Sequence, residues 1–589
     1  MHRNVFSLLV ASLLFVTAGV PGVCAQATDG AAPVASPGVP PTVFENPVLV
    51  KRYQQTITPE DLASHLYFFA SDFFEGRATT ARGQKLAAHY LASQYRKMGV
   101  APRGTVETSD PYAPEAYFQP FTVYSQRLKL ATLEVLVDGE TAAANTFSST
   151  RQDPDAYLTY GNMPEVEGQV VFAGYGIADP ALGYDDYAAL RAAGVETAGH
   201  WVLILRDEPL EDAETSRLPT HDGAPSVWSQ SIYQKIRAAR STGGMPKGYL
   251  VVGDVGPRTE APVAEVARRK ALALEEVGSL SLSEVGMTPR PPFYTISSAL
   301  ADAILAPTGR TVADLQREID AELKPVVFEV PGNVSVRSRI EAGTEPLTTE
   351  NVVAFIEGSD PELKDEVVII SSHYDHVGID PSREGDQIFN GADDDGSGTV
   401  ATLEVAEAFA RARRDGYGPR RSVLFLNVSG EEKGLLGSEH FADVEPVVPL
   451  DRIVTNLNID MIGRHDPTHE GEENYIYIIG SNLISQELHD INVKVNDVTE
   501  VGLELSERFN SKDDPNQFYA RSDHWNFGKH GVPFIFFFNG THEDYHGVDD
   551  EPDRIDYARM ADVARLIFGT AWQVANQEAR PAVSGTGFN

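Results

Sequence analysis

The feature that most constrains the fold is a series of short apolar runs after residue 350, separated by helical patterns. The runs read NVVAFIEG, DEVVIISS, RSVLFLNV, RIVTNLNID and VPFIFFFNG. In one of the intervening patterns, Leu403, Ala406 and Ala410 share a helical face. Buried strands that alternate with helices favour a sheet that is covered on both sides. We therefore predict an α/β fold with a mixed, largely parallel central sheet flanked by helices.

Side chains that bind metals or move protons follow four of these runs. In chain order they are His373 with Asp375, Glu431 with Glu432, Asp460, and a loop that holds His546. The stretch NGADDDGSG adds three aspartates, residues 393–395, at the start of a helix. In an open α/β sheet, ligands bind outside the carboxyl ends of the strands. The sequence therefore predicts that these side chains meet at one edge of the sheet.

Histidine and carboxylates without cysteine are a donor set that suits zinc or a similar divalent ion. The set is too large for one ion, and it fits a two-metal site built from His373, Glu432, Asp460 and His546, with one bridging aspartate. Spacing alone does not choose the bridge among the three aspartates 393–395.

The adjacent glutamates have different predicted roles because neighbouring side chains on an extended segment point in different directions. Glu432 reaches the metals, and Glu431 accepts the proton of a water molecule and passes it to the leaving amine. Asp375 is expected to orient an imidazole, as metal-binding histidines usually require.

Each motif taken alone also has a purely structural interpretation. HYDH can lie on the surface, DDDGSG can cap a helix or bind calcium, GEE can be a solvated turn, and Asp460 can cap a helix. The aspartate spacing does not match an EF-hand loop, however. For His524 and His542 we expect a supporting or merely polar role rather than ligation. GxSxG is absent from the sequence, which favours water attack at metals over a serine acyl-enzyme.

The N-terminus, MHRNVFSLLVASLLFVTAGVPGVCAQA, has the pattern of a secretory signal peptide. We predict a signal peptide over 1–27 and export to the periplasm or the medium. Cys24 is the only cysteine, and Val23 before it is a poor match to a lipoprotein signal. Lipid anchoring at Cys24 is therefore not expected, and no second apolar stretch is long enough for a membrane span.

The 589 residues exceed what one core normally holds. We predict a linker over 28–48, a first part of the main domain over 49–125 with helices near 58–71 and 81–99, and a β-rich insert over 126–330. Within the insert we expect a helix around Ile232–Arg240, and a helix over TVADLQREIDAEL leading back to the main domain. Residues 331–575 would complete the main domain, and 576–589 form a loose tail.

The net charge is −37, from 48 basic and 85 acidic residues. A nucleic-acid surface needs clustered Lys and Arg, which this sequence lacks. Anionic membranes would also repel such a chain. The charge therefore argues against both partners.

Five motifs, in the order SSHYDHVG, NGADDDGSG, SGEEKGLLGS, NLNIDMIG and DYHGVDD, resemble a known family. They are similar to the metal motifs of the co-catalytic zinc peptidases that include bacterial leucyl aminopeptidases and glutamate carboxypeptidase. HLYFFASDFFEGRATTARG resembles the opening of the bacterial members. The region with GYGI, YDDY and AARSTGGMPKGYLVV resembles a protease-associated domain. The resemblance thus implies a zinc exopeptidase fold with an inserted protease-associated domain.

Position by position, the resemblance implies two Zn²⁺ ions. One would be held by His373 and Asp460, the other by Glu432 and His546, with Asp394 as the bridge. Gly396 departs from the family pattern but is not a ligand.

The resemblance also implies roles for three further residues. Glu431 would be the general base, and Asp375 the partner of His373. The hydroxyl of Tyr545 would stabilise the tetrahedral intermediate.

The implied activity is that of an exported di-zinc exopeptidase, an aminopeptidase acting on peptide substrates. One alternative is a carboxypeptidase or dipeptidase of the same family, which needs a cation for the substrate carboxylate; Arg521 is a candidate. An alternative of another class is a non-catalytic, receptor-like binding protein. The presence of all five ligands and Glu431 argues against it. The sequence indicates no oligomeric state.

Overall fold

The computed structural model describes residues 39–587, apart from gaps at 149–154, 221–222, 242–243, 260, 268–278, 285–289, 382, 472, 512–513 and 515. The predicted signal peptide, Cys24 and the first part of the predicted linker lie outside the described residues. Within the described part of the chain, no helix has both the length and the apolar character that a membrane crossing requires.

Three helices open the described chain, and the two that the sequence predicts are confirmed. They are α1 (Pro47–Gln54), α2 (Pro59–Phe69) and α3 (Arg82–Met98). The Thr58 side chain caps α2 by accepting a hydrogen bond from the amide of Asp61, and Pro59 occupies the first turn. Helix α3 ends at Gly99, whose left-handed backbone (φ +80°) is readily adopted by glycine.

A mixed sheet forms the centre of the main domain, which confirms the predicted fold class. Its middle is parallel, in the order β17–β14–β18–β21. Strand β13 flanks β17 antiparallel, and β19 flanks β21 antiparallel. The bounds are β13 (Val334–Ile356), β14 (Val367–His373), β17 (Ser422–Val428), β18 (Ile453–Ile459), β19 (Tyr475–Ile479) and β21 (Phe534–Phe538), with the short edge strands β1 (Ala101–Pro102) and β20 (Glu504–Ser506).

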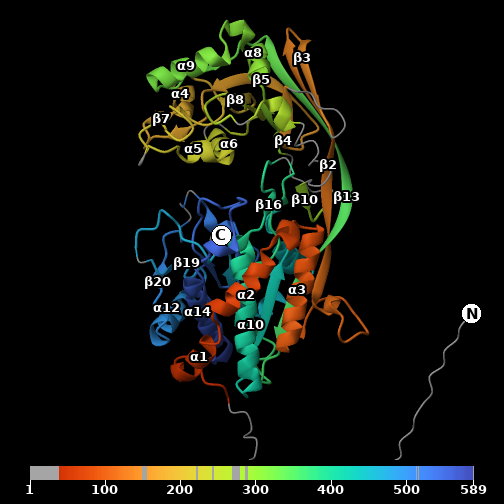
Figure 1. The fold of residues 1–589 in the computed structure, drawn as a ribbon, viewed down its shortest axis with the longest axis vertical. Helices are drawn as coiled ribbons and strands as arrows, with labels where there is room; N and C mark the ends of the chain where they lie inside the picture. Colours follow the sequence, from red (N-terminus) through yellow and green to blue (C-terminus); the bar gives the residue numbers. More distant parts are fainter. Residues whose placement is uncertain are drawn as a thin grey trace, which may run out of the picture. The chain divides into compact units, whose positions relative to one another are not determined.

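Hydrophobic side chains cover both faces of this sheet. Because side chains alternate along a strand, Ile370 and Phe425 belong to one core, and Ile369 and Leu424 to another. Helices α1, α2 and α3 pack in the first core with α10 (Gly398–Arg414), α12 (Gln486–Val498) and α14 (Tyr557–Asn576) (Figure 1). The second face is covered by α13 (His524–Gly528) and the short helical segments Leu436–Glu439 and His440–Val444.

The predicted insert has its own hydrophobic core and contains more helix than expected. Its sheet runs β12–β5–β8–β9–β11–β4, and β5, β8, β9 and β11 are parallel. Parallel neighbours need crossover connections, which are usually helical; this is why the region is not simply β-rich. The strands are β3 (Glu140–Phe147), β4 (Ala156–Tyr160), β5 (Glu165–Ala173), β6 (Ala178–Asp179), β7 (Tyr184–Asp185), β8 (Trp201–Leu205), β9 (Gly248–Val252), β10 (Ser279–Ser281), β11 (Phe293–Ile296) and β12 (Val327–Glu329). The helices are α4 (Asp186–Ala192), α5 (Val227–Gln230), α6 (Ile232–Ser241), α8 (Ser298–Leu305) and α9 (Val312–Glu322).

Both helices that the sequence predicts within 126–330 are present, as α6 and α9. Thr311 and Asp314 form a capping box at the start of α9. That this region is a protease-associated domain stays a prediction.

A long antiparallel ribbon joins elements of the two cores. Strand β2 (Phe118–Val137) pairs with β13 from Phe118 opposite Val352 to Val137 opposite Val334 (Figure 1). Phe118 packs in the core of the main domain, whereas Val135 packs in the core of the insert. The ribbon therefore crosses the predicted boundary at residue 126 without a break.

The two ends of the described chain are attached to the main domain, unlike the predicted linker and loose tail. Trp572 Nε1 donates a hydrogen bond to the carbonyl of Pro41 at 2.9 Å, and Val43 is fully buried. At the other end, Arg580 Nε lies 2.7 Å from a Glu366 oxygen. Composition rich in Pro, Gly and Ala does not reveal such contacts, because they depend on partners far away in the sequence.

Candidate metal centre

The polar residues at the strand ends converge as predicted from the parallel order. His373 is the last residue of β14, Glu431 and Glu432 follow β17, Asp460 follows β18, and His546 lies in the loop after β21. Because β17, β14, β18 and β21 are parallel neighbours, their carboxyl ends lie at one edge of the sheet. The three aspartates 393–395 enter the same site from the turn before α10.

Asp394 lies between two imidazoles. Its Oδ1 is 3.2 Å from Nε2 of His373, and its Oδ2 is 3.0 Å from Nε2 of His546. One carboxylate thus faces two separate groups of donors, which is the arrangement that a bridging ligand requires.

The other predicted ligands divide between these two groups. On one side, Asp460 Oδ1 lies 3.7 Å from His373 Nε2. On the other, Glu432 Oε2 lies 3.1 Å from His546 Nε2. The structure therefore brings all five predicted ligands together, in the predicted pairs.

The two other aspartates of the run, Asp393 and Asp395, contact other partners. Asp395 accepts hydrogen bonds from the amides of His373, Gly398 and Met461. Asp393 accepts from the amide of Gly463, and its second oxygen is 3.3 Å from His542 Nε2. Sequence spacing did not choose the bridging ligand among the three aspartates. The geometry favours Asp394, since only Asp394 has oxygens facing both groups.

His376 also lies at the site, although the sequence predicted no role for it. Its Nδ1 is 2.8 Å from Glu432 Oε1 and 3.9 Å from Asp394 Oδ2. The sequence signal was the second histidine of HYDH.

Asp375 lies beside both His373 and Glu431, and it contacts each of them through a different group. His373 Nδ1 is 3.1 Å from the main-chain carbonyl of Asp375 and 3.8 Å from its carboxylate. Donation from Nδ1 to that carbonyl leaves Nε2 facing Asp394 with its lone pair. The Asp375 carboxylate instead accepts from the Glu431 amide at 3.2 Å and from Thr79 Oγ1 at 2.7 Å.

The buried acids of the site strongly perturb its ionisable groups. Burial, together with the nearby charges of Glu432 and Asp460, raises the pKa of Glu431 well above its usual range. Burial opposes protonation of His546, yet Glu432 and Asp394 raise its pKa to about 11. Negative charge therefore dominates the site, and the imidazoles respond by favouring their cationic forms. Divalent metal ions would supply the positive charge that these buried acids require.

Arg77 supports the site without pairing with its acids. Its guanidinium is fully buried and donates to four main-chain carbonyls. Three of them belong to the metal-site loops, at Tyr374, Asn390 and Gly391, and the fourth is that of Phe69. Arg77 therefore fixes the main chain of HYDH and of the turn that carries the aspartates.

A small cavity opens beside the metal groups. It is lined by Asp394, Glu431, Asp460, Met461, Phe518, Arg521, Phe536, Phe538, Thr541 and Tyr545. The Tyr545 hydroxyl accepts a hydrogen bond from Arg521 Nη2 at 3.2 Å, and its ring stacks on His546. Carboxylates and aromatic side chains thus both line the cavity.

His524 and His542, for which we expect a supporting or polar role, lie outside the two groups of metal ligands. His524 is buried against Phe536, and its Nε2 is 2.8 Å from the Tyr519 carbonyl. His542 contacts Asp393 rather than a predicted ligand.

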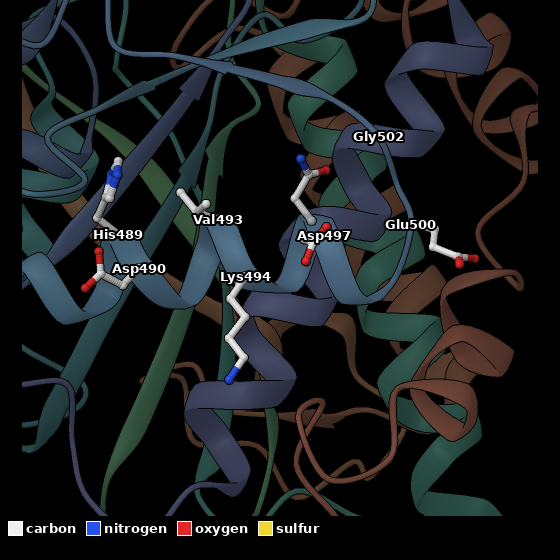
Figure 2. A pocket seen from close by; sticks show the side chains of 8 residues that line it. His489, Asp490, Val493, Lys494, Asp497, Glu500 and Gly502 are labelled. Carbon is white, nitrogen blue, oxygen red and sulfur yellow. The ribbon is translucent and has the colours of Figure 1, made fainter.

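A much larger cavity, of about 850 Å³, lies along α12 (Figure 2). Figure 2 shows His489, Asp490, Lys494 and Asp497 on this helix, with Glu500 beyond its end. None of the metal-site residues lines this cavity. Size alone therefore does not locate the site.

Comparison with known proteins shows what the region around these residues is similar to. The model of peptidase family M28 matches residues 351–571. A probable glutamate carboxypeptidase of Arabidopsis thaliana is 27% identical over 67% of this chain and 52% of its own length. An aminopeptidase of Bacillus subtilis is 25% identical over 40% of this chain and 46% of its own. A probable leucine aminopeptidase of Aspergillus oryzae is 36% identical over 22% of this chain and 23% of its own. The chain thus spans about half or less of these relatives.

Solved structures with a similar arrangement include an aminopeptidase from Aneurinibacillus sp. strain AM-1. The TM-score is 0.49 at 18% identity, over 91% of this chain and 98% of that one. A zinc aminopeptidase from Bacillus subtilis gives a TM-score of 0.47 at 17% identity, over 89% of this chain and 98% of its own. The match of the family model covers every residue of the metal groups, and residues 351–571 are thus similar to peptidase family M28.

Proposed function

We propose that this protein is an exported di-zinc exopeptidase that removes N-terminal residues from peptides. The observation that carries the proposal is the Asp394 carboxylate, which faces His373 with one oxygen and His546 with the other. One ion would be held by His373, Asp460 and Asp394, and the other by Glu432, His546 and Asp394.

The donor set supports zinc because it combines imidazole and carboxylate without thiolate. When bound, two such ions would polarise a peptide carbonyl and lower the pKa of a water molecule towards about 7. The remaining chemistry belongs to the side chains of the protein.

Glu431 is the proposed general base. It lines the cavity, and the bond from its amide to Asp375 fixes the position of its main chain. Its carboxylate can accept a proton from the attacking water. The same carboxyl group would then deliver that proton to the leaving amine.

Tyr545 is proposed to donate a hydrogen bond to the oxygen that becomes negative during attack. Arg521 donates to the Tyr545 hydroxyl oxygen, which leaves the phenolic proton available for the substrate. The stacking of Tyr545 on His546 keeps the ring beside the metal groups.

The charge of the cavity supports an aminopeptidase. Of the carboxylates that line it, Glu431 is not a proposed zinc ligand, so its charge can attract a protonated N-terminal amine and repel a C-terminal carboxylate. A carboxypeptidase or dipeptidase is the second candidate, favoured by Arg521, which lines the same cavity. Arg521 already contacts Tyr545 and the ring of Phe518, however.

The proposal also includes export of the protein and the assignment of the insert to a domain family. The predicted signal peptide over 1–27 supports secretion or a periplasmic location. The motifs of residues 126–330 support a protease-associated domain.

A peptide panel tests the proposed direction of cleavage. The purified protein is assayed with one peptide sequence in three forms: unmodified, N-acetylated and C-amidated, each with and without a chelator. We expect cleavage of the unmodified and C-amidated forms, and none after chelation. Cleavage of the acetylated form but not of the amidated form would replace the aminopeptidase by a carboxypeptidase.

Arg521→Gln provides a matched control for that panel. If Arg521 binds a substrate carboxylate, this variant loses activity on the unmodified peptide but not on the C-amidated one. We expect equal effects on both forms. A protein that binds two metals but cleaves none of the peptides would instead fit a receptor-like binding role.

A further inference from the structure

His376 is a buried imidazole whose position the five predicted ligands do not explain. Its side chain is fully buried. Neither ring nitrogen makes a hydrogen bond with the described residues. Buried polar atoms are nearly always hydrogen-bonded, so an exception requires an explanation such as an ion.

The ring is directed at the second group of metal ligands. Nδ1 lies 2.8 Å from Glu432 Oε1, but the two atoms are not aligned as a hydrogen bond. The same nitrogen is 3.9 Å from Asp394 Oδ2, and the ring is edge-on to His546 with centroids 5.7 Å apart. Three side chains from three separate segments thus surround His376 Nδ1. A cation held between His376 Nδ1 and Glu432 Oε1 would produce this arrangement, because each atom would direct its lone pair at the cation rather than at the other atom.

The main chain is shaped to hold this ring in place. The His376 amide donates to the Arg77 carbonyl at 3.1 Å, which fixes its backbone. Gly391 leaves room for the ring, because a Cβ there would stand 2.5 Å from His376 Cδ2. Gly391 also has a φ of +54°, which side-chain-bearing residues rarely adopt. A larger residue at 391 would therefore displace the imidazole.

We infer that His376 is a further ligand of the second metal, binding through Nδ1. This inference rests on the proposed di-zinc function and goes beyond the five ligands assigned to it. The second position would then have two imidazoles, whereas the first has only that of His373. Asp394 would contribute to both positions. The second ion would accordingly be held more firmly, and the first would exchange more readily.

The alternative is that His376 merely donates a hydrogen bond to Glu432. An outer partner of that kind typically changes metal affinity by about 10–100-fold. Loss of a direct ligand should change metal affinity by more than that range. Direct counting of bound imidazoles separates the two roles independently of affinity.

The test uses the full-length protein reconstituted with two Co²⁺ ions. Imidazole N–H protons of Co²⁺-bound histidines are shifted far outside the usual proton NMR range, and they disappear in D₂O. We expect three such resonances, from His373, His376 and His546. His376→Gln should show two. His542→Gln is the matched control, because His542 is another largely buried imidazole beside an aspartate, and it should still show three.

Zinc affinity supplies the second readout, by competition with a chelator. His376→Gln should weaken one of the two sites by more than about 100-fold and leave the other nearly unchanged. His376→Asn places a polar atom near the position of Nδ1, so it should lose less than His376→Gln. Circular dichroism checks that both variants are folded.

Two resonances in the native protein, or an equal count in native protein and His376→Gln, would overturn this inference while leaving the di-zinc proposal intact. A weakening below about 100-fold would do the same. A protein that binds no Co²⁺ or Zn²⁺ would instead remove the proposed function itself.

Discussion

The insert and the main domain both bury charged side chains, but they neutralise them differently. In the insert, the Lys235 ammonium is buried and donates to the carbonyls of Tyr175 and Leu205. Asp186 and Asp207 lie close enough to this cation to interact with it electrostatically. The insert thus places a cation of its own beside these buried acids.

In the main domain, the buried acids of the metal groups exceed the fixed cations. Arg77 is the nearby guanidinium, and it donates to carbonyls rather than to carboxylates. Its charge acts on Asp394 and Asp375 only at a distance. The contrast teaches that buried charge by itself does not mark a site. Buried charge whose partner is missing from the protein does, because it requires an external cation.

The largest expected effect follows from removing that cation. Chelation should abolish peptide hydrolysis, and zinc should restore it. Hydrogen exchange followed by mass spectrometry should quicken at 373–376, 391–397 and 429–433, where the loops lose their shared partner. Strands β8 and β9 of the insert should exchange as before. Equal acceleration in both regions would mean that the metal supports the whole fold rather than the site.

Glu431→Gln should have the next largest effect. The substitution keeps the shape of the side chain but removes its ability to accept a proton. We expect kcat to fall by about 10²–10⁴-fold while zinc content stays at two per chain. Steady-state kinetics and metal analysis of the same sample check this. Normal turnover would exclude Glu431 as the base.

Lys235→Met tests the other side of the comparison. It leaves the carbonyls of Tyr175 and Leu205 without their buried donor and the neighbouring acids without a nearby cation, so we expect the free energy of unfolding of the insert to fall by about 1–3 kcal/mol. Chemical denaturation, with hydrogen exchange to assign the affected strands, measures the change. Zinc content should not alter. A variant as stable as the parent would show that Lys235 does not balance the insert.

The smallest effect concerns pH. Burial lowers the pKa of Lys235 to about 8, below its ordinary value of 10.5. Between these values the unfolded chain binds more protons than the folded one, so the free energy of unfolding should rise with pH. The expected slope is about 1 kcal/mol per pH unit from pH 8 to 10, measured by denaturation. Lys235→Met should lack that part of the slope, and an identical slope would contradict the assignment.

The central sheet and the donor groups were predictable because they depend on local patterns. Apolar runs of strand length identified β14, β17, β18 and β21, and parallel order then placed His373, Glu432 and Asp460 together. Spacing did not select Asp394, since that depends on how the turn before α10 folds back over the sheet.

Other features depend on contacts that no local pattern encodes. The position of His376 requires the space left by Gly391 and the backbone bond to Arg77, which is about 300 residues away in the sequence. The predicted domain boundary at 126 falls inside the ribbon of β2 and β13, because one continuous strand contributes side chains to two cores. Pro41 and Arg580 are held by partners more than 200 residues distant.

The most direct test of the central claim is the number of zinc ions bound per chain. Native mass spectrometry of the zinc-reconstituted protein, beside Glu432→Ala prepared in the same way, provides it. The uncompensated acids predict two zinc ions in the native protein and fewer in the variant. A native protein that binds no zinc, or a variant that binds as many ions as the native chain, would contradict the account.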